Sequence, residues 1–328
     1  MFHSSIDIQY VYKIIVILLY SYFVTLWSIP YVTYKLKKYG YTTQDKYKID
    51  KKSVPTMGGI AILIGVLVSL ALSQILINTT DLGSLFIFYF IIVIYALYGV
   101  VDDLFSFKKR YDKIIALLIL TFPIASLITD TNMNLIFFHL ELGWVYSLIV
   151  VPLYIMVVAN LINLHAGYNG LTQGLSLIIL VTLGIKSFLD SGVTNLIYLM
   201  PILGAVIAFL PGTFHPAKVL PGNVGDLLVG AAIGAFIVIN RQLWFGIFIL
   251  IPHIINFIMD TWTIIIRRRK DIKFGSVRSD GVIIAPKTMK YKSLKFLIVS
   301  WFKLTERQAV YVLYAFTVLF CVTGLIFF

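Results

Sequence analysis

Amide and carboxylate side chains gather at three points of a chain that is otherwise strongly apolar. In chain order they are Asp102 and Asp103, then Asn160, Asn163 and Asn169, then Asp226. Each group lies at one end of an apolar run that is long enough to cross a membrane. An amide or carboxylate beside hydrocarbon costs several kcal/mol unless it has a partner, so its repeated use at such ends indicates a bound ion or ligand.

The chemistry that these groups offer is oxygen coordination. The chain has one cysteine, Cys321, and its five histidines are scattered, so the donor set suits a hard cation. Magnesium takes one or two protein oxygens and leaves its other positions to water and phosphate. With lysines and arginines nearby, this set predicts phosphoryl transfer between a soluble nucleotide donor and a lipid phosphate, where cations offset the repulsion between two anions.

The elements that must position these side chains are membrane helices. Of the 328 residues, 59% are hydrophobic and 13% are charged, a composition outside the soluble globular range. We therefore expect an all-α polytopic membrane protein in which residues 1–328 form one integral membrane domain. Apolar windows predict ten membrane-spanning helices, near residues 8–32, 58–78, 85–101, 114–129, 144–162, 172–189, 193–211, 225–241, 243–262 and 308–328.

The positive charges predict how this domain sits in the membrane. If the connections after the odd-numbered helices share one side, all of the 27 lysines and arginines except Lys13, Lys186 and Arg241 lie there. Because cytoplasmic loops are enriched in these residues, we expect a cell-membrane protein with both termini outside the cytoplasm. All three polar groups then face a cytoplasmic cleft. The predicted cytoplasmic loops cover about 33–57, 102–113, 163–171, 212–224 and 263–307.

The last of these loops carries two further patterns. Two short strand-like runs flank Ser279-Asp280-Gly281, a composition that predicts a small β-hairpin. The following segment, 287–304, mixes lysines with large apolar residues and predicts an amphipathic helix at the membrane interface.

Five segments in chain order suggest a family. They read QDKYK with PTMGG, YGVVDDLFSFKKRYDK, NLINLHAGYNGLTQG, VLPGNVGD, and IPHIINF before the basic hairpin. Together, over nearly the whole chain, they resemble the polyprenyl-phosphate N-acetylhexosamine-1-phosphate transferases of glycosyltransferase family 4. The resemblance is closest to the archaeal and eukaryotic UDP-GlcNAc:dolichyl-phosphate GlcNAc-1-phosphotransferases.

This resemblance implies an activity and its partners. The enzyme would transfer N-acetylhexosamine-1-phosphate, with GlcNAc as the expected sugar, from a UDP-sugar to polyprenyl or dolichyl phosphate. UMP would be released, and the step would begin glycan assembly on a lipid carrier. The implied cofactor is Mg²⁺, with Mn²⁺ as a substitute. Membrane lipid is an expected partner, nucleic acid is not, and a homodimer is left open.

The resemblance also implies roles for the polar residues near the phosphates. By motif, Asn163 and Asp226 would hold Mg²⁺ on the pyrophosphate of the donor. Asp102 and Asp103 match an aspartate pair assigned to positioning or activating the lipid phosphate. Lys113 matches a lysine that contacts phosphate, although the spacing here has one extra residue.

Roles in substrate recognition follow in the same way. Asp45 and Lys48 match an Asp-x-x-Lys beside the lipid-phosphate entrance, and Asn169 matches the residue that reads the uracil edge. Asn223 stands where the family has an aromatic residue, so uracil stacking would come from elsewhere or be weaker. For the sugar, the last loop offers Arg278 and the run 267–270 in place of an arginine and histidine motif.

Other interpretations of the same residues compete with this one. The bacterial branch that transfers a muramyl-peptide phosphate is disfavoured, because no histidine follows His253. A transporter or flippase for an anionic substrate would place its polar groups mid-span, between paired repeats. A structural scaffold would tolerate Asp226→Ala in every assay. Individually, Asp102 and Asp103 could simply end a helix, and Asn160 and Asn163 could bond neighbouring helices.

Overall fold

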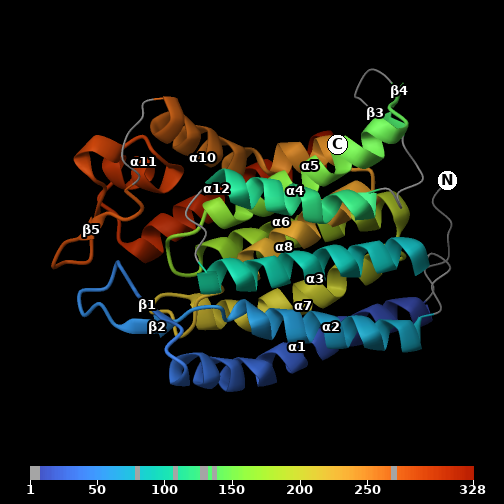
Figure 1. Ribbon diagram of the computed structural model, residues 1–328, viewed down its shortest axis with the longest axis horizontal. Helices are drawn as coiled ribbons and strands as arrows, with labels where there is room; N and C mark the ends of the chain where they lie inside the picture. Colours follow the sequence, from blue (N-terminus) through green and yellow to red (C-terminus); the bar gives the residue numbers. More distant parts are fainter. Residues whose placement is uncertain (1–7, 78–81, 106–109, 126–131, 135–138, 267–271) are drawn as a thin grey trace.

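The computed structural model describes residues 8–77, 82–105, 110–125, 132–134, 139–266 and 272–328. Its helices run side by side as one bundle (Figure 1). Strands β1, β2 and β5 and helix α11 lie beyond one end of this bundle, on the left in Figure 1, whereas β3 and β4 lie at the other end. The helices of the bundle are α1 (Ile8–Lys38), α2 (Gly59–Leu76), α3 (Leu82–Phe105), α4 (Arg110–Ala125), α5 (Val151–Leu164), α6 (Leu171–Ser191), α7 (Leu196–Thr213), α8 (Gly222–Ile239), α9 (Leu243–Ile249), α10 (Ile251–Thr261) and α12 (Glu306–Phe327).

The predicted membrane architecture is confirmed, but the count of ten spans is not. Within the described ranges, eight helices are long and apolar enough to cross a membrane. A ninth is reached if α9 and the following segment Ile251–Ile266 form one span, although they are bent by 66°. The break falls at Leu250, and Pro252 lies in the first turn of α10, where its missing amide donor interrupts the helical ladder. Helix α4 has only 16 described residues.

The predicted β-hairpin is confirmed. Strand β5 (Ser276–Val277) pairs antiparallel with β6 (Ile283–Ile284), and Gly281 in the turn has a φ of +81°. Two other antiparallel pairs were not predicted. They are β1 (Thr42–Gln44) with β2 (Ser53–Pro55), and β3 (Asn132–Asn134) with β4 (His139–Glu141). Strands of three residues are too short to show a period of two in the sequence.

The segment predicted as an amphipathic helix is shorter than expected. It contains a 3₁₀ turn, η3 (Lys287–Met289), and α11 (Leu294–Trp301), which begins after the N-cap Ser293. The apolar residues Leu294, Phe296 and Val299 of α11 are buried in a second core cluster, and α11 contacts α10 and α12. Its apolar face therefore packs against protein.

Helix α8 is the centre of the bundle and packs directly on the backbones of its neighbours. A Cβ on Gly59 of α2 would lie 2.2 Å from the Cα of Gly225, and one on Gly99 of α3 would lie 2.5 Å from the Cα of Val224. Small residues allow such close approach, which is how membrane helices gain packing energy. These contacts hold the first turn of α8 against the start of α2 and the last turns of α3.

Candidate active site

A cavity of about 260 Å³ lies at the end of the bundle where the predicted polar groups meet. Its walls come from the β1–β2 loop, the ends of α3 and α5, the starts of α6 and α8, and Phe274. The predicted site residues that line it are Asp45, Asp103, Asn163, Asn169, Asn223 and Asp226. The polar groups read from distant parts of the sequence thus share one site.

Asp226 and Asn163 both line this cavity, and each has a side-chain oxygen that could coordinate a metal ion. Asp226 is buried in the second turn of α8, and its Oδ1 accepts a 2.9 Å hydrogen bond from Nε2 of Gln173. Asn163 lies next to the last residue of α5. In the described part of the chain, no group of three or more His, Cys, Asp or Glu side chains could enclose a metal. A site with two protein oxygens still fits Mg²⁺, which shares its coordination with water and phosphate.

Asp103 holds the start of α8. Its Oδ1 accepts from the backbone N of Asn223 at 3.1 Å and from the side-chain Nδ2 at 2.9 Å, and its Oδ2 accepts from the N of Val224 at 3.2 Å. A carboxylate on these unpaired amides is a favourable helix cap. Asp102, the other member of the predicted pair, is buried and is not among the described residues that line the cavity.

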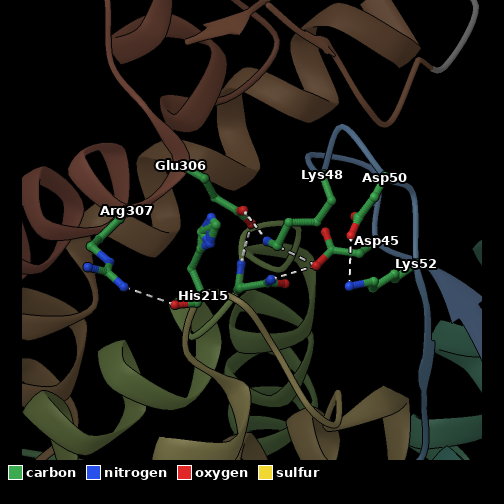
Figure 2. Close-up of polar contacts among 8 residues, drawn as sticks. Asp45, Lys48, Asp50, Lys52, His215, Glu306 and Arg307 are labelled. Carbon is green, nitrogen blue, oxygen red and sulfur yellow. Dashed lines mark hydrogen bonds and ion pairs between the residues drawn. The ribbon is translucent and has the colours of Figure 1, made fainter. Parts of the chain in front are cut away.

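Four polar residues form a closed ring at this wall, and two of them, Asp45 and Asn169, line the cavity (Figure 2). Nζ of Lys48 lies 3.0 Å from Oδ2 of Asp45 and 3.0 Å from Oε2 of Glu306. Asn169 closes the ring, because its Nδ2 donates to Oδ2 of Asp45 at 2.7 Å and its backbone N donates to Oε1 of Glu306 at 2.7 Å. Lys48 stands behind the described cavity wall, with its ammonium between two carboxylates.

Glu306 was not predicted as a site residue. It is the first residue of α12, behind a capping box formed by Thr305 and Gln308. This box is a sequence signal for a helix start. The capping box does not indicate that the side chain of Glu306 points into the protein. In the structure this residue is only 3% exposed.

His215 and Arg307 lie on one side of this ring, to the left in Figure 2. Nη2 of Arg307 donates to the backbone O of His215 at 3.1 Å. Burial, together with the positive charges of Lys48 and Arg307, lowers the pKa of His215 below its usual value, and the carboxylates of Glu306 and Asp45 oppose that shift. The net shift favours the neutral form of the His215 imidazole.

An aromatic group forms another part of the wall. The ring of Tyr47 lies edge-on to Tyr168 at 5.1 Å and to Phe274 at 6.1 Å. The hydroxyl of Tyr47 accepts a 3.1 Å hydrogen bond from the N of Gly275, and burial raises the pKa of Tyr47 to about 12. Tyr47 and Tyr168 are buried, whereas 40% of Phe274 is exposed. No sequence pattern singled out Phe274.

The loop between α5 and α6 is held in place by a contact with Lys295 of α11. Nζ of Lys295 donates to the backbone O of Ala166, and it occupies the space where a Cβ on Gly167 would lie. Gly167 also has a φ of +133°, a conformation that side chains other than hydrogen rarely allow. Helix α11 therefore fixes the loop that carries Asn169.

The remaining predicted residues lie elsewhere. The guanidinium of Arg278 is exposed and pairs with Asp280, and Arg278 is absent from the described cavity lining. Lys113 lies in α4, but its side chain is outside the described part of the structure, as is the whole run 267–270. Lys46 was not predicted, yet it lines the cavity. His165 and His253 are buried ring to ring at 4.6 Å, in agreement with a packing role.

Comparison with known proteins places the chain among relatives of similar length. It is 28% identical over 320 residues to a protein of Saccharolobus solfataricus, covering 94% of this chain and 95% of the relative. That relative carries the provisional name UDP-N-acetylglucosamine–dolichyl-phosphate N-acetylglucosaminephosphotransferase.

Two bacterial relatives match shorter stretches. The phospho-N-acetylmuramoyl-pentapeptide-transferase of Streptococcus agalactiae serotype Ia is 31% identical over 233 residues, which cover 66% of this chain and 69% of that protein. A Bacillus subtilis protein, provisionally named undecaprenyl-phosphate N-acetylglucosaminyl 1-phosphate transferase, is 33% identical over 232 residues, covering 67% of this chain and 62% of that protein.

The family model of glycosyl transferase family 4 matches residues 85–241. This range contains the cavity residues of α3, α5, α6 and α8, including Asp103, Asn163 and Asp226, while Asp45, Phe274 and Glu306 lie outside it. With the membrane bundle, the shared cavity and these relatives taken together, the chain belongs to glycosyl transferase family 4.

Proposed function

We propose that this membrane protein transfers N-acetylglucosamine-1-phosphate from UDP-N-acetylglucosamine to a polyprenyl or dolichyl phosphate and releases UMP. The names of the archaeal and Bacillus relatives support the donor sugar and the two kinds of lipid acceptor. The observation that carries the proposal is the cavity at one end of the bundle, where Asp226, Asn163 and Asn169 meet. A site at a helix end differs from the mid-span site of a transporter.

In this reaction the lipid phosphate replaces UMP on the phosphorus that carries the sugar, so one phosphoanhydride bond is formed and another is broken. An oxygen of the lipid phosphate forms a bond to the phosphorus that carries the sugar, and the bond from that phosphorus to the bridging oxygen breaks, so that UMP leaves. A phosphate monoester has a second pKa of about 6 and is mostly dianionic at neutral pH. The nucleophile therefore needs positioning more than it needs a strong base.

Asn163 and Asp226 would hold Mg²⁺ at the donor pyrophosphate, and the ion would neutralise charge there. Gln173 fixes the orientation of the Asp226 carboxylate through its 2.9 Å hydrogen bond. Asp103 fixes α8, which carries Asp226, through three contacts with the first turn. We assign Asp102, Asp103 and Lys113 to the region of the acceptor phosphate.

The uridine would lie between Asn169 and the aromatic wall. The amide of Asn223, at the position of the family's aromatic residue, is bound to Asp103 and offers no stacking surface. Phe274 lines the cavity and is 40% exposed, so its ring could offer such a surface. Stacking of a base on an aromatic ring contributes about 1–3 kcal/mol.

The distribution of lysine and arginine supports a cytoplasmic site with both termini outside. Lys51 is exposed in the β1–β2 loop and can report this orientation, whereas Lys292 is buried. A membrane-impermeant amine reagent should modify Lys51 only in inside-out vesicles. Mass spectrometry of the peptide that contains Lys51 would detect the modification. Modification in right-side-out vesicles would reverse the topology.

The activity is tested with purified protein, radiolabelled UDP-GlcNAc and a short polyprenyl phosphate. We expect label to move into the organic phase and UMP to appear in equal amount, with both lost when EDTA removes the metal. UDP-N-acetylmuramoyl-pentapeptide is the second donor, because the streptococcal relative bears that name. Transfer from it alone would replace the proposed donor, and transfer from neither would refute the activity.

A further inference from the structure

Glu306 lies in a place that a glutamate rarely occupies without a partner. It begins a long apolar helix, where acidic side chains are usually exposed and interact with the helix dipole. Here the side chain is turned inward and is 3% exposed. A buried carboxylate is costly unless it is hydrogen-bonded and paired, so its partners must be strong ones.

Those partners come from two other parts of the chain. Oε1 of Glu306 accepts from the backbone N of Asn169, 137 residues away, and Oε2 accepts from Nζ of Lys48, 258 residues away. One side chain therefore joins the start of α12 to the β1–β2 loop and to the loop before α6 (Figure 2). Glu306 does not line the described cavity, but Asn169 and Asp45 do.

The ring fixes which end of the Asn169 amide is available to a ligand. An ionised carboxylate only accepts hydrogen bonds, so Asp45 must receive the Nδ2 group of Asn169, as the 2.7 Å contact has it. A flipped amide would set two oxygen atoms against each other. Asp45 takes one of the two Nδ2 hydrogens, so the amide is held with its carbonyl Oδ1, which can only accept, at a fixed position beside the remaining Nδ2 hydrogen.

This arrangement selects among nucleobases. Uracil presents an N–H donor at its N3 position, which matches an accepting oxygen, whereas cytosine presents an acceptor at the same position. We infer that the ring of Asp45, Lys48, Glu306 and Asn169 sets the preference for a uridine donor, with Glu306 as a positioning residue that acts through Asn169. This inference rests on the proposed function.

The Lys48 ammonium contributes by holding the two carboxylates together. It lies 3.0 Å from each, so it offsets the repulsion between Asp45 and Glu306 at a site with little access to water. In this role Lys48 supports the ring from behind. This role does not require Lys48 to face the lipid-phosphate entrance, beside which the family motif places it.

The test compares UDP-GlcNAc with CDP-GlcNAc as donors for the purified full-length protein. In Glu306→Gln, Oε1 can still accept from Asn169, but the pairing with Lys48 is lost and the ring loosens. We expect the ratio of kcat/KM for the two donors to fall by about tenfold, while kcat with saturating UDP-GlcNAc stays within about threefold. Asp50→Asn is the matched control, because Asp50 pairs with Lys52 on the exposed side of the same loop.

Asp45→Asn provides a second variant that leaves the Glu306 contacts in place. An asparagine at position 45 can donate or accept, so the Asn169 amide can flip, and the same ratio should fall. An unchanged ratio in both variants, or an equal loss with both donors, would overturn the inference. If the unmodified protein transfers from neither donor, the proposed function itself fails, which is a separate result.

Discussion

The two ends of α6 use polar residues in opposite ways. At its last turn, Asp190 pairs with Lys186 and accepts a 2.9 Å hydrogen bond from Nε2 of Gln242, and nearby Asn195 donates to Asn240 at 2.8 Å. At its first turn, Thr172 lines a cavity together with Asp226 and Asn169. The polar groups at the last turn of α6 bond to one another and connect helices. Those at the first turn are held by neighbouring residues and line the cavity. Polarity at a membrane helix end is therefore not enough to mark a site.

The largest difference between the two ends of α6 is expected when one carboxylate at each end is neutralised. Asp226→Asn should reduce kcat by about a thousandfold or more, because it removes the proposed charged ligand of the metal. The side chain keeps its size, so the melting temperature should stay close to that of the unmodified protein. Transfer assays with radiolabelled UDP-GlcNAc would measure the loss.

The control for this experiment is Asp190→Asn, which removes a carboxylate of the same kind from the far end of α6. It should leave kcat within about twofold, because it contacts no cavity residue. Full activity of Asp226→Asn, or a matching loss in Asp190→Asn, would remove the distinction between the two ends.

At the cavity end of α6, the ring of Phe274 is expected to contribute to binding of the donor. Phe274→Leu should raise KM for UDP-GlcNAc by about tenfold with little change in kcat, because leucine keeps the apolar contact with Tyr47 but loses the stacking surface. Inhibition by UMP should weaken by the same factor. Tyr291→Leu, at a residue that is 63% exposed and away from the cavity lining, should change neither value. A raised KM with unchanged UMP inhibition would show that Phe274 contacts the sugar instead.

The third prediction concerns stability at the far end. Asp190→Asn should lower the free energy of unfolding by about 1 kcal/mol, because the ion pair with Lys186 is lost while a hydrogen bond to Gln242 can persist. Thermal unfolding in detergent would show a melting temperature lower by a few degrees. An unaltered melting temperature would mean that this polar cluster does not fasten the helices.

The smallest effect is expected from His215. Its pKa in the folded protein is lowered by burial, Lys48 and Arg307, so the unfolded chain binds more protons near and below pH 6.5. Stability from this group is therefore present above pH 6.5 and is lost as the pH falls toward the lowered folded-state pKa. In His215→Gln, the melting temperature should fall less between pH 7.5 and pH 5.5 than it does in the unmodified protein, as scanning fluorimetry would show. Equal slopes would exclude His215 as a source of acid sensitivity.

The sequence predicted those site residues whose polarity stands out against an apolar surrounding. Asp226 and Asn163 interrupt runs of hydrophobic residues, and polar side chains at such positions have a high free-energy cost in a membrane. The sequence alone therefore indicated a functional role for them. Glu306 and Phe274 lie among ordinary loop and helix-start residues. Their inward positions depend on contacts with segments far away in the chain, such as Lys48 and Tyr47, and no local pattern contains that information.

Helix positions were predicted better than helix ends. The first helix continues to Lys38, beyond the predicted residue 32, because lysine and leucine favour helix after the apolar window has ended. The bend at Leu250 was missed for the opposite reason, since hydropathy measures apolar length and does not register a change of direction.

The backbone contact between Gly59 and Gly225 has a consequence for how the protein can vary. In an ordinary pair of packed residues, a substitution that enlarges one side chain can be compensated by a second substitution that makes the other side chain smaller. Here both partners already lack a side chain, so neither has any volume to give up. A suppressor of Gly59→Ala would have to arise outside this pair, by shifting α2 or α8 as a whole, and a shift of α8 would displace Asp226.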